Sequence, residues 1–402
     1  GEPLDKICFI GQSATGKTGL LEFIYEKIAY ILSLELINDN SLLAWKDSIQ
    51  NNNNEIVVLF ENDVLKLKNQ DVFFRNRSYK EEEFNNDGKI TSLIPLQYKK
   101  DPVYFKANLI SDKSINFLST NPIDIIEKHN NDIQYVKDQF KNKENYGLIF
   151  SENVDTEIWL HLLSDILNYR KNFTQKMSEL IHTGIITDAK KLVSEFNKWK
   201  EKNPNVLESF AKEFNYILEH LNLEVDLVNT EYLVPIKNKR IDETIPFEDT
   251  STGTKQLLLT SLPLYSLNTQ DSIIIIDEPE RSLYPNIQMD LIDYYKNLAP
   301  EAQFIVATHS PFIAASFEPE ERFILYFDEE GKVAFRRGSS PIGDDPNDML
   351  YNDFRINYIN KYGQQKHQEY LDLKQKIHFE KDPKKKEEIS EQLEKLGEEY
   401  NF

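Results

Sequence analysis

The sequence lacks the features of several protein classes. It has one cysteine, Cys8, among 402 residues, so the chain cannot form an internal disulfide or supply a thiolate zinc cluster. No apolar run approaches the roughly 18 residues that span a bilayer, and no signal-peptide pattern is visible. These features predict a cytoplasmic protein that works in a reducing compartment and without a membrane.

Basic residues are too few for a general nucleic-acid coat. The 47 lysines and arginines face 67 aspartates and glutamates, which gives a formal net charge of −20. This balance excludes a basic surface over the whole chain but leaves a local basic groove open. The length is sufficient for a sizeable core and for two or three structural units.

What the sequence does contain is a phosphate-binding pattern at residues 11–18, GQSATGKT. It fits the Walker A pattern G-x-x-x-x-G-K-[ST], and it lies between a predicted strand at 6–10 and a predicted helix at 20–32. Lys17 is expected to reach the β- and γ-phosphates of a nucleotide, and Thr18 to ligate Mg²⁺. A glycine-rich turn that binds nothing is the alternative. The predicted nucleotide-binding loop consists of Gly11, Gln12, Ser13, Ala14, Thr15, Gly16, Lys17, Thr18 and Gly19.

A second motif, SIIIIDEPE, begins at residue 272. Four consecutive isoleucines are typical of a strand that is buried on both faces of a parallel sheet. The strand ends in Asp277 and Glu278, at the edge where ligands of open α/β sheets bind. We expect Asp277 to support the Mg²⁺ that Thr18 contacts, and Glu278 to orient or deprotonate the attacking water. The alternative is an apolar strand that merely ends in acids.

Two further segments extend this pattern. QFIVATHSP gives a third buried strand, which ends close to His309; a histidine there is suited to sense the γ-phosphate through a hydrogen bond. STGTKQLL, residues 251–258, predicts a helix that Ser251 caps and whose backbone Gly253 leaves open to a ligand. An ordinary helix cap would look the same.

The order of apolar patterns predicts four regions. Residues 1–120 form an N-terminal lobe that is rich in strands, among them EIVVLF, KITSLIPL and SINFLST. Residues 121–225 form a helical insertion with core stripes too short for a coiled-coil arm. Residues 226–340 form a C-terminal lobe, which includes a hairpin with Gly331 in its turn. Residues 341–402 form a charged helical tail.

Together these motifs resemble those of ABC-type ATPases of the SMC and DNA-repair branch, especially the OLD-like ATPases of bacterial anti-phage systems. In that comparison residues 251–256 are the signature, ERSLYP is the D-loop and His309 is the switch histidine. The tail stretch SPIGDDPNDMLYNDF is similar to one in the Septu defence ATPases. The resemblance implies an α/β fold, namely an ABC-type P-loop NTPase head with a central, mostly parallel sheet, and it implies ATP and Mg²⁺ as cofactors.

The same resemblance implies a composite active site. Ser251 and Gly253 of one copy would contact the γ-phosphate that Lys17 of another copy holds, so ATP would join two heads in a homodimer or a higher even oligomer. The sequence departs from the family pattern at Ser13-Ala14, Thr254 and Tyr284, but no catalytic group is lost. Hydrolysis by Glu278, His309 and Lys17 is therefore expected. Gln97 is the candidate for the family's glutamine loop.

The predicted activity is ATP hydrolysis that controls a separate effector, a nuclease, in anti-phage defence. The tail shows no nuclease pattern of its own, and a nucleic acid or a phage protein is the expected trigger. A DNA-repair-type ATPase that acts directly on nucleic acid is the main alternative. A transporter subunit is disfavoured by the insertion of about a hundred residues and by the lack of apolar spans. A purely structural ATP-binding protein is disfavoured by the presence of Glu278 and His309.

Overall fold

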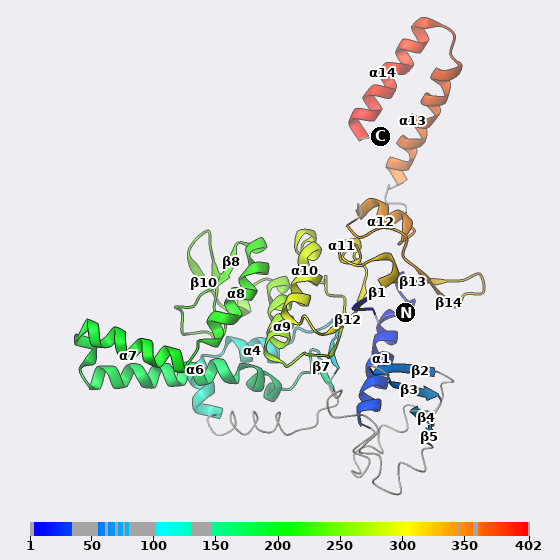
Figure 1. Ribbon diagram of the computed structural model, residues 1–402. Helices are drawn as coiled ribbons and strands as arrows, with labels where there is room; N and C mark the ends of the chain where they lie inside the picture. The colour runs from blue at the N-terminus through cyan, green and yellow to red at the C-terminus, as the bar shows by residue number, and fades with distance from the viewer. Residues whose placement is uncertain are drawn as a thin grey trace. The chain divides into compact units, whose positions relative to one another are not determined.

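The computed structural model describes residues 4–33, 55–60, 63–68, 71–74, 77–79, 102–129, 147–343, 346–356 and 361–400. Within these ranges the chain is built of α-helices and β-strands (Figure 1). It divides into two compact units, Gly1–Gly338 and Ser339–Phe402, and the boundary follows the last strand of the larger unit.

A seven-stranded sheet forms the centre of the larger unit, in the order β14-β13-β1-β12-β11-β6-β7. All neighbouring strands are parallel except β13 and β14, which pair antiparallel. The predicted mixed α/β fold with a mostly parallel sheet is therefore confirmed. The strands are β1 (Lys6–Gly11), β6 (Val103–Phe105), β7 (Leu148–Phe150), β11 (Ile273–Asp277), β12 (Gln303–Thr308), β13 (Arg322–Phe327) and β14 (Val333–Arg337).

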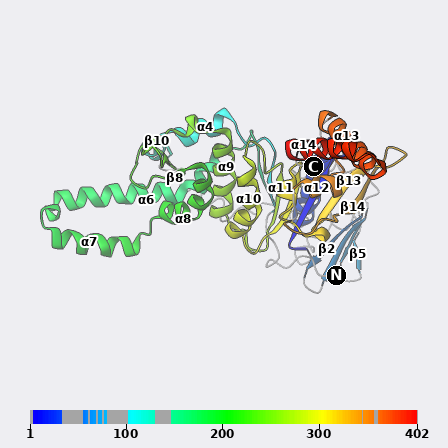
Figure 2. The same cartoon turned by 90° about the horizontal axis from the view of Figure 1, so that it is seen from above.

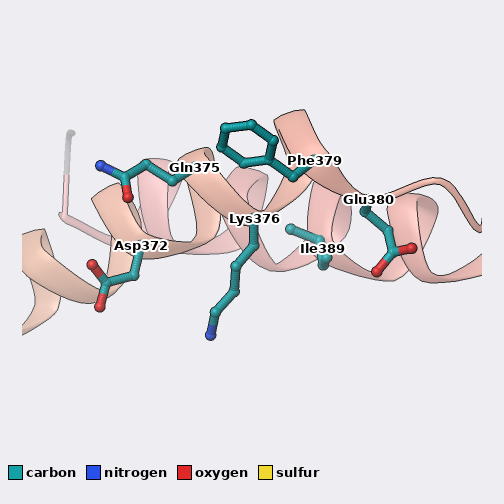
Figure 3. A pocket seen from close by; sticks show the side chains of 6 residues that line it. All are labelled: Asp372, Gln375, Lys376, Phe379, Glu380 and Ile389. Atoms are coloured by element: carbon teal, nitrogen blue, oxygen red, sulfur yellow. The ribbon is translucent and has the colours of Figure 1, made fainter.

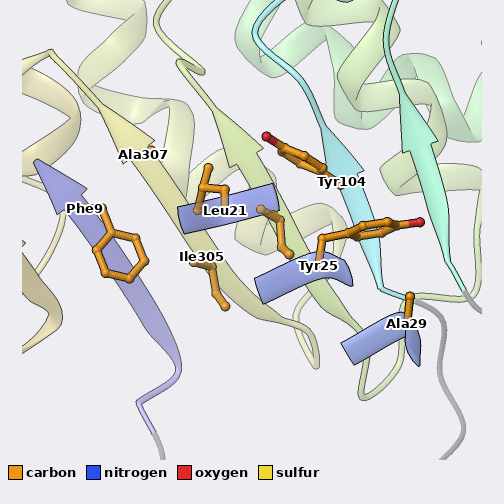
Figure 4. Packing of buried hydrophobic residues seen from close by; sticks show 8 residues of the cluster. Phe9, Leu21, Tyr25, Ala29, Tyr104, Ile305 and Ala307 are labelled. Atoms are coloured by element: carbon orange, nitrogen blue, oxygen red, sulfur yellow. The ribbon is translucent and has the colours of Figure 1, made fainter. Parts of the chain in front are cut away.

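Helix α1 (Lys17–Ser33) covers one face of this sheet. Its buried residues pack against side chains of β1, β6, β11 and β12 (Figure 4), and these form one core cluster: Phe9, Leu21, Tyr25, Ala29, Tyr104, Ile275, Ile305 and Ala307. Strand residues that alternate with these, such as Phe304 next to Ile305, are buried as well, and their side chains project from the opposite face. There Lys296 of α10 (Pro285–Leu298) places its Nζ 5.6 Å from the Phe304 ring centre. Burial on both faces explains the unbroken apolar runs of β11 and β12.

Two smaller sheets accompany the central one. A four-stranded antiparallel sheet runs in the order β2-β3-β4-β5, and a three-stranded antiparallel sheet runs in the order β10-β9-β8. Their strands are β2 (Glu55–Phe60), β3 (Asp63–Lys68), β4 (Asp71–Phe74), β5 (Arg77–Tyr79), β8 (Leu223–Val225), β9 (Ile236–Asn238) and β10 (Glu243–Ile245).

Helices α6 (Thr156–His182) and α7 (Ala189–Lys202) form a hairpin through the short helix η3 (Ile185–Thr187) (Figure 2). Four aromatic rings hold the two helices together, with centre-to-centre distances of 5.7 to 6.2 Å: Tyr169, Phe173, Phe196 and Trp199. The larger unit also contains α4 (Asp112–Ser119), α8 (Val206–Leu218), α9 (Thr252–Ser266) and α11 (Pro311–Ala314).

Three sequence expectations need correction or lie outside the description. SINFLST, predicted as a strand, belongs to α4, because Ser111 caps this helix by accepting a hydrogen bond from Ser114 N over 3.2 Å. The range 121–225, predicted as helical, also contains β7 and β8, which are each too short to show a periodic pattern. KITSLIPL and Gln97 lie outside the described residues. The predicted hairpin is confirmed as β13–β14, with Gly331 in its turn at φ 78°.

The smaller unit consists of helices α12 (Pro346–Asn352), α13 (Lys361–Phe379) and α14 (Pro383–Tyr400). A pocket of about 440 Å³ lies between α13 and α14 (Figure 3), and its lining includes Phe379 and Ile389. Among the described residues of the whole chain, none of the helices has the length and apolar character that a membrane span requires.

Candidate nucleotide-binding site

The turn from β1 to α1 has an unusual backbone. Gly16 has φ 82° and Ala14 has φ 68°, which is the left-handed region that side chains disfavour. Gly11 meets a different constraint: a Cβ atom there would lie 2.5 Å from the carbonyl oxygen of Leu325 on β13. Gln12 and Ser13 are exposed, and so is the first turn of α1 at Thr18 and Gly19. The predicted loop therefore folds as an open turn that is anchored at its first glycine.

Lys17 spans this turn from inside. Its Nζ donates hydrogen bonds to Gly11 O over 2.9 Å and to Gln12 O over 3.1 Å, and the side chain of Thr15 also donates to Gln12 O, over 2.8 Å. Burial lowers the pKa of Lys17, while the carboxylate of Asp277 acts in the opposite direction. The ammonium group therefore lies where the phosphate oxygens of a nucleotide could replace the carbonyl oxygens of Gly11 and Gln12 as its hydrogen-bond acceptors.

Thr18 and Asp277 meet at the end of β11. Thr18 Oγ1 donates a hydrogen bond to Asp277 Oδ2 over 2.7 Å, although 259 residues separate the two in the chain. Burial raises the pKa of Asp277, and the hydrogen bond from Thr18 lowers it. A hydroxyl and a carboxylate are the ligands that Mg²⁺ takes beside the phosphates of a nucleotide. The structure therefore brings together the two residues predicted for the metal.

A pocket of about 310 Å³ opens beside this pair. Its lining comes from α1, from β6 and the loop after it, from the loop after β7, and from the end of β11. The hydroxyl of Tyr104 is buried there without a hydrogen-bond partner among the described residues. An orphaned hydroxyl beside a carboxylate fits a hydrated cation. The lining residues are Thr18, Tyr104, Lys106, Ala107, Asn108, Ser151, Glu152, Asn153, Asp277 and Glu278.

Glu278 and His309 face each other across the ends of β11 and β12. His309 Nε2 lies 3.9 Å from Glu278 Oε1, and both side chains are part-exposed. Burial lowers the pKa of His309, and Lys17 lowers it further, so the neutral imidazole is favoured. Glu278 itself has a left-handed backbone, φ 49°, and its N–H donates to Ala307 O over 2.9 Å. A carboxylate and a neutral imidazole so placed can orient a water molecule.

The signature segment begins helix α9. Ser251 is its N-cap residue, because its Oγ accepts a hydrogen bond from Thr254 N over 3.1 Å. Gly253 has a role that the sequence did not reveal: a Cβ there would lie 2.5 Å from Ser282 O. This glycine therefore allows the ERSLYP turn to pack against the helix start. Neither Ser251 nor Gly253 lines the pocket beside Asp277.

Sequence reasoning missed several residues that hold the site together. Glu280 accepts a hydrogen bond from His309 N over 2.8 Å, and burial raises the pKa of this carboxyl. Arg281 donates to Ala107 O over 3.1 Å and to the side chain of Asn108, in the loop that lines the pocket. The available sequence signal for Glu280 and Arg281 was their position in the stretch DEPERS, directly after the strand that ends in Asp277. Nothing in the sequence marked Asn108.

A family comparison agrees with this geometry. The family described as AAA ATPase domain matches residues 3–314, which is more than half of the chain. The protein belongs to this AAA ATPase domain family. The matched range includes the Walker A loop, both carboxylates at the end of β11, and His309.

Individual relatives are distant. The Retron Vc95 probable ATPase of Vibrio cholerae serotype O1 biovar El Tor is 21% identical over 383 residues, which are 85% of this chain and 73% of that protein. The Septu protein PtuA of Bacillus thuringiensis is 34% identical over 67 residues, only 17% of each chain. Septu PtuA therefore matches a short segment rather than the whole protein.

Solved structures with partial similarity include heads of SMC proteins. The Smc head domain from Pyrococcus furiosus, with an extended coiled coil and bound to the C-terminal domain of ScpA, is 14% identical, with a TM-score of 0.38 over 83% of this chain and 91% of that one. The SMC head domain from Thermotoga maritima is 11% identical, with a TM-score of 0.37 over 84% and 91%. These scores are too low to establish a shared overall fold.

Proposed function

We propose that the protein binds ATP with Mg²⁺ and hydrolyses it to ADP and phosphate. The hydrogen bond between Thr18 and Asp277 carries this proposal, since it joins the Walker A helix to the end of β11 beside a pocket. Lys17 would hold the β- and γ-phosphates, and Thr18 with Asp277 would hold the metal. Glu278 would act on the attacking water, with His309 as the contact to the γ-phosphate.

We further propose that two copies share each active site. Ser251 and Gly253 do not line the pocket of their own chain, yet the N-terminus of α9 offers backbone N–H groups that suit an anion. A second copy that presents this helix to the γ-phosphate would complete the site. ATP would then favour a homodimer, or a higher even oligomer, and hydrolysis would loosen it.

Mixed dimers of two inactive variants test the shared site. Ser251→Arg should leave ATP binding by each copy nearly intact but should block ATP-dependent dimerisation and hydrolysis. Lys17→Ala should bind ATP much more weakly. Mixing the two variants should restore roughly one working site per mixed dimer. Mixed dimers that form but stay inactive would show that each copy builds its own site.

We propose that the ATP-driven assembly controls a separate effector nuclease in anti-phage defence, in the cytoplasm, after a nucleic acid or a phage protein triggers it. The resemblance of the motifs to the OLD-like ATPases supports this role, and so does the similarity to a retron ATPase and to a segment of a Septu protein. Co-purification of the tagged protein with the products of its neighbouring genes, followed by mass spectrometry, tests for the effector.

One observation favours a second candidate, direct action on nucleic acid. The α6–α7 hairpin carries seven lysines against four acidic residues between positions 171 and 202, within a chain of net charge −20. Basic patches of this kind bind phosphate backbones in a salt-dependent manner. ATPase assays with and without duplex DNA separate the two candidates: stimulation that falls with salt, and with Lys190→Glu or Lys191→Glu, would favour direct action.

A further inference from the structure

The hydroxyl of Tyr104 is buried without a hydrogen-bond partner among the described residues. Tyr104 lies on β6 with none of its surface exposed, and no described residue forms a hydrogen bond with its Oη. Leaving a buried hydroxyl unpaired destabilises a folded protein, and such groups are uncommon in native structures. The pocket that Tyr104 lines is the place where a partner for this hydroxyl would enter.

Strand register places Tyr104 next to the proposed metal site. Tyr104 on β6 pairs with Ile275 on β11, and side chains alternate along a strand, so Asp277 projects from the same face of the sheet. Helix α1, which carries Thr18, covers this face. Figure 4 shows the Tyr104 oxygen directed toward the carboxyl-terminal ends of the parallel strands. Burial raises the pKa of Tyr104, and the negative charge of Asp277 raises it further, as expected for close neighbours.

The ring of Tyr104 is held in this orientation. The Tyr25 ring packs on it at a centre-to-centre distance of 5.7 Å. Lys106 Nζ lies 5.8 Å from the ring centre, where a cation is attracted to the aromatic face. Glu22 fixes Lys106 in turn through an ion pair of 2.8 Å. With its ring packed in this way, Tyr104 presents a pre-positioned hydroxyl to the pocket.

We propose that the Tyr104 hydroxyl accepts a hydrogen bond from a water ligand of the nucleotide's Mg²⁺ ion, and that Tyr104 is a positioning residue for that metal. The inference rests on the proposed binding of ATP. Mg²⁺ in proteins keeps several water ligands and takes only one or two carboxylates. Among the described residues no cluster of three His, Cys, Asp or Glu side chains could hold a metal, so Thr18 and Asp277 would leave coordination positions for water that neighbouring polar groups can orient.

The test compares Tyr104→Phe with the wild type in direct nucleotide-binding titrations. Phenylalanine keeps the ring and its packing, and it removes only the hydroxyl. With ATP and Mg²⁺ the variant should bind about 5- to 10-fold more weakly, the loss expected for one hydrogen bond to a polarised group. With ATP in EDTA the two proteins should bind equally. Without nucleotide the variant should melt no lower than the wild type, because an unpaired hydroxyl has been removed.

Tyr294→Phe is the matched control, since Tyr294 is 2% exposed on α10 and does not line the pocket. It should change neither titration. Equal affinity of Tyr104→Phe and the wild type for ATP with Mg²⁺ would overturn the inference. An equal loss with and without Mg²⁺ would overturn it too, since the hydroxyl would then act on the nucleotide or the loop. If the wild type itself binds no ATP under either condition, the proposed function fails instead.

Discussion

Ser310 donates a hydrogen bond from its Oγ to Oε1 of Gln288 over 2.6 Å. The Gln288 side chain in turn donates a hydrogen bond from Nε2 to Leu283 O over 2.7 Å, within the ERSLYP turn. Gln288 is 9% exposed. One buried side chain thus links the turn that packs on Gly253 with the residue that follows His309.

Gln288→Leu should lower turnover more than it weakens ATP binding, because Leu283 in the ERSLYP turn and Ser310 after β12 would both lose their hydrogen bond to this side chain. Leaving buried polar groups unpaired costs about 1–3 kcal/mol, so a fall in kcat of roughly 5- to 100-fold is expected with little change in KM. Gln303→Leu is the control: Gln303 donates to Leu4 O over 2.7 Å at the opposite end of β12. Similar kcat values for the two variants would contradict the proposed link.

Lys17→Ala should weaken ATP binding by roughly 10- to 100-fold, as expected for the loss of charge-assisted hydrogen bonds to phosphate. Isothermal titration of the purified variant checks this. Lys27→Ala, on the same helix, removes a lysine that does not contact the loop and should bind ATP normally. Unchanged affinity of Lys17→Ala would refute the assignment of the loop.

Glu278→Gln should bind ATP and Mg²⁺ but turn over about 10²–10⁴-fold more slowly, the loss typical of a positioned base. It should also accumulate the ATP-bound dimer. Glu280→Gln provides a contrast, because the amide oxygen can still accept the hydrogen bond from His309 N; its turnover should fall far less. Single-turnover kinetics distinguish the two variants, and the reverse order would assign the water to Glu280.

Gly253→Ala should impair hydrolysis while sparing ATP binding. The added Cβ would approach Ser282 O to 2.5 Å, so the turn or the helix start must move. Overpacking of this kind costs about 1–3 kcal/mol, and a similar loss in thermal stability is expected. The checks are ATP affinity, turnover, the melting temperature and the ATP-dependent dimer fraction by light scattering. Full dimerisation at wild-type stability would show that the contact is dispensable.

The raised pKa of Asp277 predicts a pH dependence of stability. Because the folded state holds this proton more tightly than the unfolded state, stability without metal should fall as pH rises from the usual aspartate pKa, about 3.9, through the raised one. Asp277→Asn removes this dependence and should raise the melting temperature at neutral pH. The difference from wild type should shrink in acid. A constant difference at every pH would contradict the cause assigned here.

The sequence predicted the parts of the site whose chemistry is local. The loop at 11–18 and the acids after four isoleucines follow fixed spacings, so strand, turn and helix could be placed without a structure. The neighbours of β11 could not, because β6 and β7 are three residues long and carry no periodic signal. Tyr104 and Asn108 thereby escaped notice. SINFLST misled because its apolar residues suit a strand as well as one face of a short helix.

Strand β13 lies beyond the residues that the family description matches, yet it pairs with β1 along Cys8 to Gly11. A fragment cut after residue 314 would turn β1 into an edge strand with unpaired N–H and C=O groups and bare apolar side chains. Such edges invite pairing with other chains and aggregation. The end of the family match is therefore not a boundary at which this chain can be cut without exposing β1: a fragment that keeps β1 paired on this side must extend at least through Phe327, the last residue of β13.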